Sequence, residues 1–191
     1  RERLFVLATS DPEPMVRARS WEALSDAVDD EAIRDEMLRR FFDPETAPEE
    51  HAALVLALAP SPIEEVHSLI RALYDEPETR AIALEAMWRS HNPDYRPHVV
   101  AALQEEDQMV RRQAVLGVGY LQLADDAELL LPFFQEPELR SDALYSYALA
   151  APVELDQTAL LEFLKRLDEA AFSLDEDEAE LVQSALDERL L

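Results

Sequence analysis

The chain has 191 residues and no Cys, and its 42 Asp and Glu outnumber its 17 Lys and Arg, giving a formal net charge of −25. Without Cys it forms no disulfides and no thiolate zinc sites, which suits a reducing compartment, so we expect a cytoplasmic location. The negative charge opposes binding to phosphate backbones and anionic membranes, so we expect neither nucleic acid nor a membrane as a partner. No apolar run approaches the roughly 18–20 residues needed to cross a bilayer.

A pattern that recurs about every thirty residues divides the chain into units. Each copy has an acidic or Pro-containing turn before the start of a helix, and four of the copies end on Arg. If Arg17, Glu50, Arg80, Arg111 and Arg140 are taken as markers, the steps are 33, 30, 31 and 29 residues. The second copy, which has Glu50 in place of Arg, is degenerate. A fixed period in this range predicts stacked helical repeats.

Residues 1–10 read as the end of a helix from a truncated preceding repeat, because the chain opens within an apolar helical pattern. Each marker then lies in the first helix of a pair. We expect these first helices at approximately 13–28, 47–59, 77–91, 108–122 and 137–150. Three and six positions after the markers lie mostly small residues: Ser20 and Ala23, Ala53 and Leu56, Ala83 and Ala86, Ala114 and Gly117, Ala143 and Ser146. Because residues three apart share a helix face, these positions predict close helix packing.

The second helix of each pair is expected at approximately 31–42, 63–74, 95–105, 126–135 and 156–170. Its predicted core positions are Phe41, Leu73, Leu103, Phe133 and Leu164, with Met37, Leu69, Val99, Leu129 and Leu160 four residues earlier. Apolar residues at this spacing form a stripe along one face of an α-helix. Pro132 lies inside the fourth of these helices and predicts a late start or a kink.

A last helix is expected at roughly 177–190, and the segment 176–191 is more polar than the repeats and has no marker Arg. Terminal repeats must present a solvated face, so this segment is interpreted as a C-terminal cap. We therefore expect an all-α fold: a right-handed α-solenoid (α–α superhelix) of about five helix pairs, with residues 1–191 forming a single domain.

Asp11 to Leu24 follows the pattern Asp-Pro-x-x-Val-Arg-x-x-Ala-x-x-Ala-Leu with Ser20 in the first Ala position, and Glu106 to Val118 follows it with Gly117 in the second. This pattern resembles the HEAT repeat family, and most closely the short HEAT-like repeats of phycobilisome lyases. The resemblance implies that the Arg column (Arg17, Arg80, Arg111 and Arg140) is structural. Each Arg would pair with an acidic residue of an adjacent turn and bind carbonyl groups, and a ligand-binding role is the less favoured alternative.

The family includes enzymes, so their motifs were sought in this sequence. No His is followed by Glu, as it is in the di-iron hydroxylases of this fold, and Glu64-x-x-His67 has no second copy that would complete a dinuclear site. His91 and His98 flank Asp94 in a loop and are a candidate for a weak metal site, although a solvated or hydrogen-bonded ring is the default for all four His. No nucleophile elbow, phosphate loop or catalytic triad spacing is present. We expect no catalytic residues, no metal and no cofactor.

Phe42, Tyr74 and Phe134 each follow a core position of a second helix, and second helices generally line the concave face of HEAT-type solenoids. The three rings are candidates for a partner-binding ridge, and the alternative is that they fill the grooves between repeats. The acidic surface favours a basic partner. The sequence thus predicts a non-catalytic protein-interaction module or scaffold. A lyase-like or metal-assisted enzyme or chaperone is the alternative, and it requires a pocket with converging polar groups.

Overall fold

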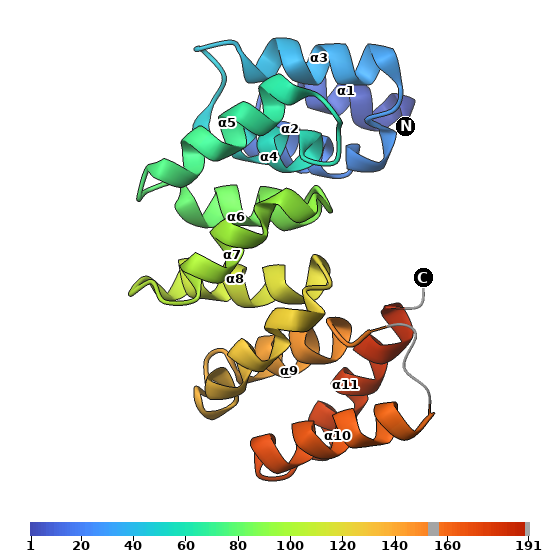
Figure 1. Ribbon diagram of the computed structural model, residues 1–191. Helices are drawn as coiled ribbons and strands as arrows, with labels where there is room; N and C mark the ends of the chain where they lie inside the picture. The colour runs from blue at the N-terminus through green and yellow to red at the C-terminus, as the bar shows by residue number, and fades with distance from the viewer. Residues whose placement is uncertain (153–156, 190–191) are drawn as a thin grey trace. The chain divides into compact units, whose positions relative to one another are not determined.

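The computed structural model describes residues 1–152 and 157–189, and these are helical and contain no β-strand. The chain divides into two compact units, Arg1–His91 and Asn92–Leu191, which are described separately. Figure 1 shows the chain with its α-helices labelled, and the label η denotes a 3-10 helix in the text. The all-α fold of consecutive helix pairs is confirmed, whereas the single domain over 1–191 stays a prediction.

The first unit contains seven helices in its described residues. They are α1 (Glu2–Ser10), α2 (Pro14–Glu22), η1 (Ser25–Ala27), α3 (Glu31–Phe41), α4 (Pro48–Leu58), α5 (Glu64–Asp75) and α6 (Arg80–Arg89). The first helices α2, α4 and α6 lie side by side, and α3 and α5 pack on α4 and α6 respectively. Pro14 and Pro48 occupy the first turns of their helices, where the missing N–H has no helical partner to lose.

The predicted helix at 13–28 is divided, because α2 ends at Glu22 and η1 follows it. Ala23 is therefore exposed, unlike the other nine positions three or six residues after the markers, which are buried. The prediction of a closely packed small-residue face is confirmed at these nine positions. It is wrong at Ala23, which lies beyond the end of the helix.

The second unit also contains seven helices in its described residues. They are η2 (Pro93–Tyr95), α7 (Arg96–Ala102), α8 (Gln108–Tyr120), η3 (Ala124–Gln135), α9 (Arg140–Leu149), α10 (Gln157–Ala171) and α11 (Glu176–Glu188). Asp107 caps α8 by accepting bonds from the N–H groups of Met109 and Val110 at 2.8 and 3.1 Å. A Cβ atom added at Gly119 would lie 2.7 Å from Cα of Ser146, which shows how closely α8 and α9 approach.

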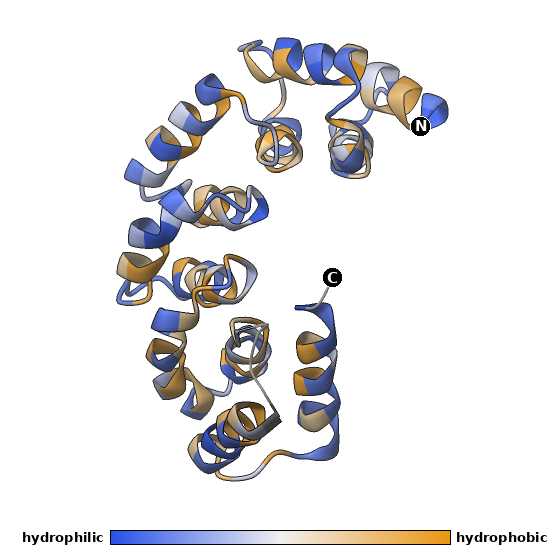
Figure 2. Cartoon of the chain, turned by 45° about the vertical axis from the view of Figure 1, so that its right-hand side comes forward, coloured by the Kyte–Doolittle hydropathy of each residue, from blue (hydrophilic) through white to orange (hydrophobic). Residues whose placement is uncertain are grey.

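The α11 helix packs against α9, and in Figure 2 its hydrophobic side faces α9 while its hydrophilic side faces away. The Asp175 side chain caps α11 by accepting a bond from the backbone N–H of Glu178. The Glu178 side chain in turn accepts a bond from the backbone N–H of Asp175. The cap predicted at 176–191 is thus confirmed as a helix over its described residues. Residues 190–191 lie outside them.

The second helix of the fourth repeat differs most from its prediction, because the whole of η3 is a 3-10 helix with Pro132 inside it. Ala127, Leu130 and Phe133 are buried at the three-residue spacing of a 3-10 helix. Leu129, predicted to be buried four residues before Phe133, is instead 45% exposed. The prediction assumed an α-helical period, and Pro132 disfavours a continuous α-helix because its ring clashes with the carbonyl four residues earlier.

Candidate functional site

The four marker Arg side chains make the same local contact. Each guanidinium donates a hydrogen bond to the backbone carbonyl six residues earlier, at the end of the preceding helix or in the turn that follows it. The four bonds join Arg17 to Asp11 at 2.8 Å, Arg80 to Tyr74 at 2.9 Å, Arg111 to Glu105 at 3.4 Å and Arg140 to Phe134 at 2.7 Å. The geometry agrees with the structural role inferred from the resemblance. Whether these residues stabilise the fold rather than bind a ligand stays a prediction.

Three of these Arg residues also pair with a carboxylate from another repeat or from the cap. Arg17 Nε lies 2.8 Å from Glu50, Arg111 Nη2 lies 3.4 Å from Glu136, and Arg140 forms two bonds to Glu178. Arg140 additionally donates to the carbonyls of Ala171 and Ser173, both at 3.2 Å. It therefore joins α9 to the turn before the capping helix.

Glu50 is a buried charge that sequence reasoning did not identify. Its side chain is 1% exposed and accepts bonds from Arg17, from Trp21 Nε1 at 3.0 Å and from Arg40 at 3.2 Å. A buried carboxylate requires such partners. Its position in the repeat could have revealed it, because Glu50 stands where four other repeats have Arg. At this position the repeat has a carboxylate that accepts bonds in place of an Arg that donates them.

The three candidate aromatic residues lie in different environments. Phe42 is 60% exposed, Tyr74 is half-buried with the Arg80 guanidinium 5.5 Å from its ring centre, and Phe134 is fully buried. The Phe134 ring packs edge-on against Tyr147 at 5.6 Å. The prediction that three accessible rings form a ridge is therefore wrong at Phe134, because the last turn of η3 directs that ring against α9.

An apolar hollow of about 340 Å³ lies in the first unit, where α4, the end of α5 and the start of α6 meet. It is lined by Thr46, Pro48, His51, Ala52, Val55, Leu73, Thr79 and Ile82. Phe42 is linked to this hollow through ring contacts, because it packs edge-on against Phe41 at 5.1 Å and Phe41 stacks on His51 at 4.7 Å. The most exposed aromatic residue of the first unit is thus connected through Phe41 to His51, which lines the apolar hollow.

Two acidic turns border the hollow. Glu45 and Glu49 flank the lining residues Thr46 and Pro48 in sequence, and Glu76 and Glu78 precede the lining residue Thr79. All four carboxylates are exposed, and none forms an ion pair within residues 1–152 and 157–189. They leave the rim of the hollow negatively charged.

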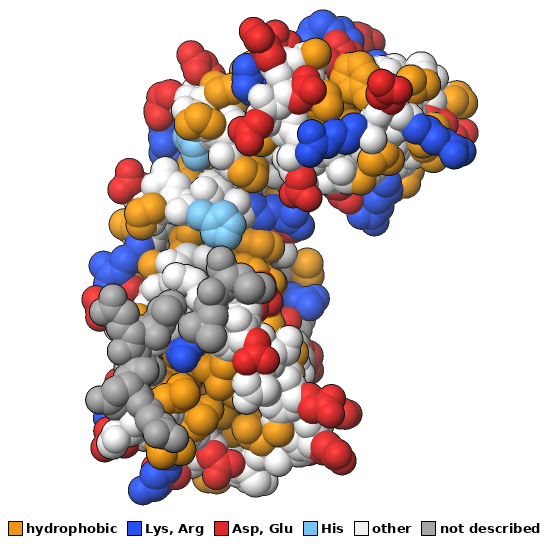
Figure 3. Space-filling view, turned by 90° about the vertical axis from the view of Figure 1, so that its right-hand side faces the viewer, with side chains coloured by type: hydrophobic (Ala, Val, Ile, Leu, Met, Phe, Trp, Pro, Cys, Tyr) orange, Lys and Arg blue, Asp and Glu red, His pale blue; other side chains and the backbone are white. Residues whose placement is uncertain are grey.

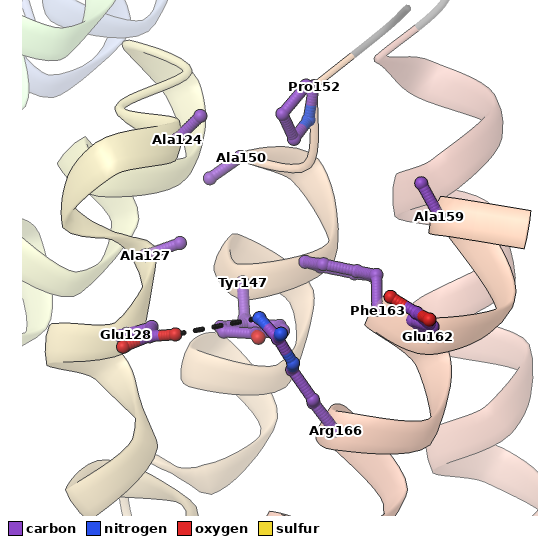
Figure 4. Close-up of a pocket in the computed structure, with 10 residues that line it drawn as sticks. All are labelled: Ala124, Ala127, Glu128, Tyr147, Ala150, Pro152, Ala159, Glu162, Phe163 and Arg166. Carbon is purple, nitrogen blue, oxygen red and sulfur yellow. Dashed lines mark ion pairs between the residues drawn. The ribbon is translucent and has the colours of Figure 1, made fainter. Parts of the chain in front are cut away.

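A second concavity, a cleft of about 260 Å³, lies in the second unit between η3 and α10 with α9 as its floor (Figure 4). Alanine side chains and the rings of Tyr147 and Phe163 form its walls, and Glu128, Glu162 and Arg166 lie at its edge. The Tyr147 and Phe163 rings stack 4.6 Å apart, and an ion pair of 3.8 Å joins Glu128 to Arg166 across the cleft.

The Tyr147 phenol of this cleft is not activated. Burial raises the pKa of the Tyr147 phenol, and the nearby Glu128 carboxylate raises it further. The phenol therefore stays protonated at neutral pH and is a poor nucleophile. Glu128 and Arg166 are about three-quarters and two-thirds exposed, so their ion pair contributes little.

The candidate metal-binding residues are not brought together. The Glu64 carboxylate bonds to Arg71, whereas His67 Nε2 lies 3.0 Å from the Ser61 carbonyl oxygen. Among the described residues, no three His, Asp or Glu side chains are grouped closely enough to hold a metal ion. In the same part of the chain, every helix is too short or too polar to span a membrane.

Charged side chains are mixed on the face shown in Figure 3, where Arg groups are scattered among Asp and Glu and form no continuous basic patch. The helix pairs follow one another along the chain. They share an Arg–carbonyl contact and buried small residues, as the units of a repeat protein do. Residues 63–148 match the family model for HEAT repeats. This segment runs from the start of α5 to the end of α9 and so includes residues of both units. A search of curated proteins finds no match to the chain.

Proposed function

We propose that this chain is a non-catalytic protein-binding module, or scaffold, whose partner docks on the first unit beside Phe42. HEAT repeats commonly serve as interaction scaffolds, which supports this class of function for residues 63–148. The observation that carries the proposal is the pairing of a 60% exposed Phe42 with an apolar hollow of about 340 Å³. Aromatic anchors next to pockets supply much of the energy at protein interfaces.

The partner is expected to carry positive charge. Opposite charges speed encounter between proteins, and salt screens this attraction. Association should therefore slow as ionic strength rises. Duplex DNA and RNA should not bind at physiological salt, because nonspecific affinity requires cations that displace counterions from phosphates.

The proposal is tested by recovering partners from an extract of the source cells on the immobilised chain and quantifying them by mass spectrometry. Phe42→Ala should deplete the specific partner, because the variant loses the exposed ring. Phe172→Ala is the matched control, because Phe172 is 79% exposed but lies in the second unit. Equal recovery by both variants and the unmodified chain would exclude docking at Phe42.

A lyase-like or metal-assisted enzyme or chaperone is the second candidate, and the cleft of Figure 4 is the observation that favours it. That function requires a bound small molecule or metal at Tyr147, Glu128, Glu162 and Arg166. Titration with a linear tetrapyrrole or with divalent metals would then produce saturable absorbance or stability changes that Tyr147→Phe weakens. Absence of both changes would remove this alternative.

A further inference from the structure

We propose that the hollow between α4, α5 and α6 binds a short partner segment in which one large apolar side chain is flanked on both sides by Arg or Lys. This inference rests on the proposed protein-binding function and adds to it the exact location and the chemistry of the segment.

The lining of the hollow defines the central residue of that segment. Pro48, Ala52, Val55, Leu73 and Ile82 supply aliphatic contacts, and the His51 ring forms part of the same surface. Its volume of about 340 Å³ is near the lower end of the roughly 300–1,000 Å³ found for ligand pockets. One large side chain such as Leu, Phe or Trp fits this volume, with Phe42 covering the adjoining part of the segment.

The two acidic turns define the flanking residues. Glu45 and Glu49 adjoin the lining residues Thr46 and Pro48 in sequence, Glu76 and Glu78 precede the lining residue Thr79, and all four are exposed. The nearest marker cation, Arg80, donates to the carbonyl of Tyr74 at 2.9 Å and lies 5.5 Å from the centre of its ring. Arg80 thus contacts its own turn, and the four exposed carboxylates, which form no ion pair within the described residues, are available to cations near an apolar anchor.

The charge of the first unit argues against other occupants. Residues 1–91 contain 10 Arg against 20 Asp and Glu. A second copy of this chain would bring a net charge of −25 to an acidic surface, which like-charge repulsion disfavours. Nucleic acid is opposed for the same reason, because the exposed carboxylates near the hollow repel its phosphates.

The test begins with selection from a random peptide library displayed on phage, using the full chain as bait. Selected peptides should share one Leu, Phe or Trp with Arg or Lys within about three residues on each side. A synthetic peptide of that pattern is then titrated by fluorescence polarisation at low and physiological salt. Binding should weaken at least tenfold between the two salt concentrations, because several ion pairs form across the rim.

Two variants separate the apolar and charged contributions. Ala52→Leu fills the hollow while keeping a good helix former in α4, so peptide affinity should fall at least tenfold. Glu76→Gln/Glu78→Gln should lower affinity several-fold and reduce the salt dependence. Its matched control is Glu138→Gln/Glu180→Gln, which removes the same charge from exposed positions of the second unit and should leave affinity unchanged. Circular dichroism and the melting temperature establish that every variant is folded.

Each alternative result has a distinct meaning. Selected peptides that lack cations but lose binding with Ala52→Leu would overturn the basic flanks and leave the proposed function standing. Peptides that bind Ala52→Leu as tightly as the unmodified chain would overturn the hollow as the site. Concentration-dependent dimerisation abolished by Ala52→Leu would assign the hollow to a second copy. A partner that depends on Phe42, recovered when no apolar–basic peptide is selected, would overturn only the chemistry inferred for the segment.

Discussion

Arg17 and Glu50 occupy the same position in consecutive repeats, and their side chains form an ion pair of 2.8 Å in which the Glu50 carboxylate is 1% exposed. Because this one marker is Glu and not Arg, its carboxylate can accept a hydrogen bond from the marker Arg of the preceding repeat. The same carboxylate also accepts Arg40 and the Trp21 indole. A departure from the repeat pattern therefore creates a contact that joins α2, α3 and α4.

Replacing Glu50 by Gln should destabilise the fold by about 3–5 kcal/mol, the usual cost of removing one partner of a buried ion pair. Arg17 and Arg40 would remain partly buried without their shared counter-charge. Urea unfolding followed by circular dichroism measures the loss. Glu22→Gln is the control, because its pair with Arg19 is largely exposed and should contribute less than about 1 kcal/mol. Equal effects of the two variants would contradict a buried ion-pair cluster.

Arg140→Ala should destabilise the chain more than Arg111→Ala does. Arg140 binds Glu178 and three backbone carbonyls, whereas the two bonds of Arg111 are both 3.4 Å long and its buried Nε has no partner among the described residues. We expect losses of about 3 and about 1.5 kcal/mol, within the range for hydrogen bonds to charged groups. The melting temperature should fall by about 2–4 °C per kcal/mol. Unchanged melting of both variants would favour the ligand-binding alternative for the Arg column.

Gly119→Ala should destabilise the chain even though Ala is the better helix former by about 1 kcal/mol. The added Cβ would lie 2.7 Å from the Cα of Ser146, and backbone cannot move away without separating α8 from α9. Gly117→Ala is the comparison, because its Cβ would meet only the side chain of Val99, at 3.0 Å. A further Val99→Ala exchange should relieve that contact. The account would be wrong if Gly119→Ala raised the free energy of unfolding.

Stability should decrease in acid partly through Glu178. Hydrogen bonds from Arg140 hold the pKa of Glu178 below its ordinary value in the folded chain. A carboxyl group whose pKa is lower when folded stabilises the fold above its unfolded pKa of about 4.3, and this contribution is lost as pH falls through the folded pKa. The difference in unfolding free energy between the unmodified chain and Glu178→Gln should therefore be largest near pH 7 and shrink toward pH 3. Glu180→Gln, an exposed change in the same helix, should show no such trend.

The periodicity of the sequence was sufficient to predict most of the fold. Apolar residues spaced three or four apart, together with the turn residues, predict the positions of α3, α4, α5 and α8. Both signals depend on local chemistry. The η3 segment shows the limit: Pro132 indicated a distortion, but the choice of a 3-10 helix depends on how Leu130 and Phe133 pack on α9. Phe134 is consequently buried, which agrees with the alternative that the ring fills a groove and not with an exposed ridge.

The candidate site was less predictable than the fold. Phe42 was identified from its position after a core residue, and it is exposed. The hollow beside it was not identified, since it forms where three helices from two repeats meet and no single segment encodes it. Glu50 was missed for a related reason, because its three partners come from two other helices.

The most direct test of the account is hydrogen–deuterium exchange of the full chain with and without a bound partner peptide. Docking at the hollow predicts slower exchange at the start of α4, the end of α5 and the first turn of α6, with no change around Tyr147. Protection confined to η3, α9 and α10 would instead place the binding site in the cleft of the second unit and contradict the central claim.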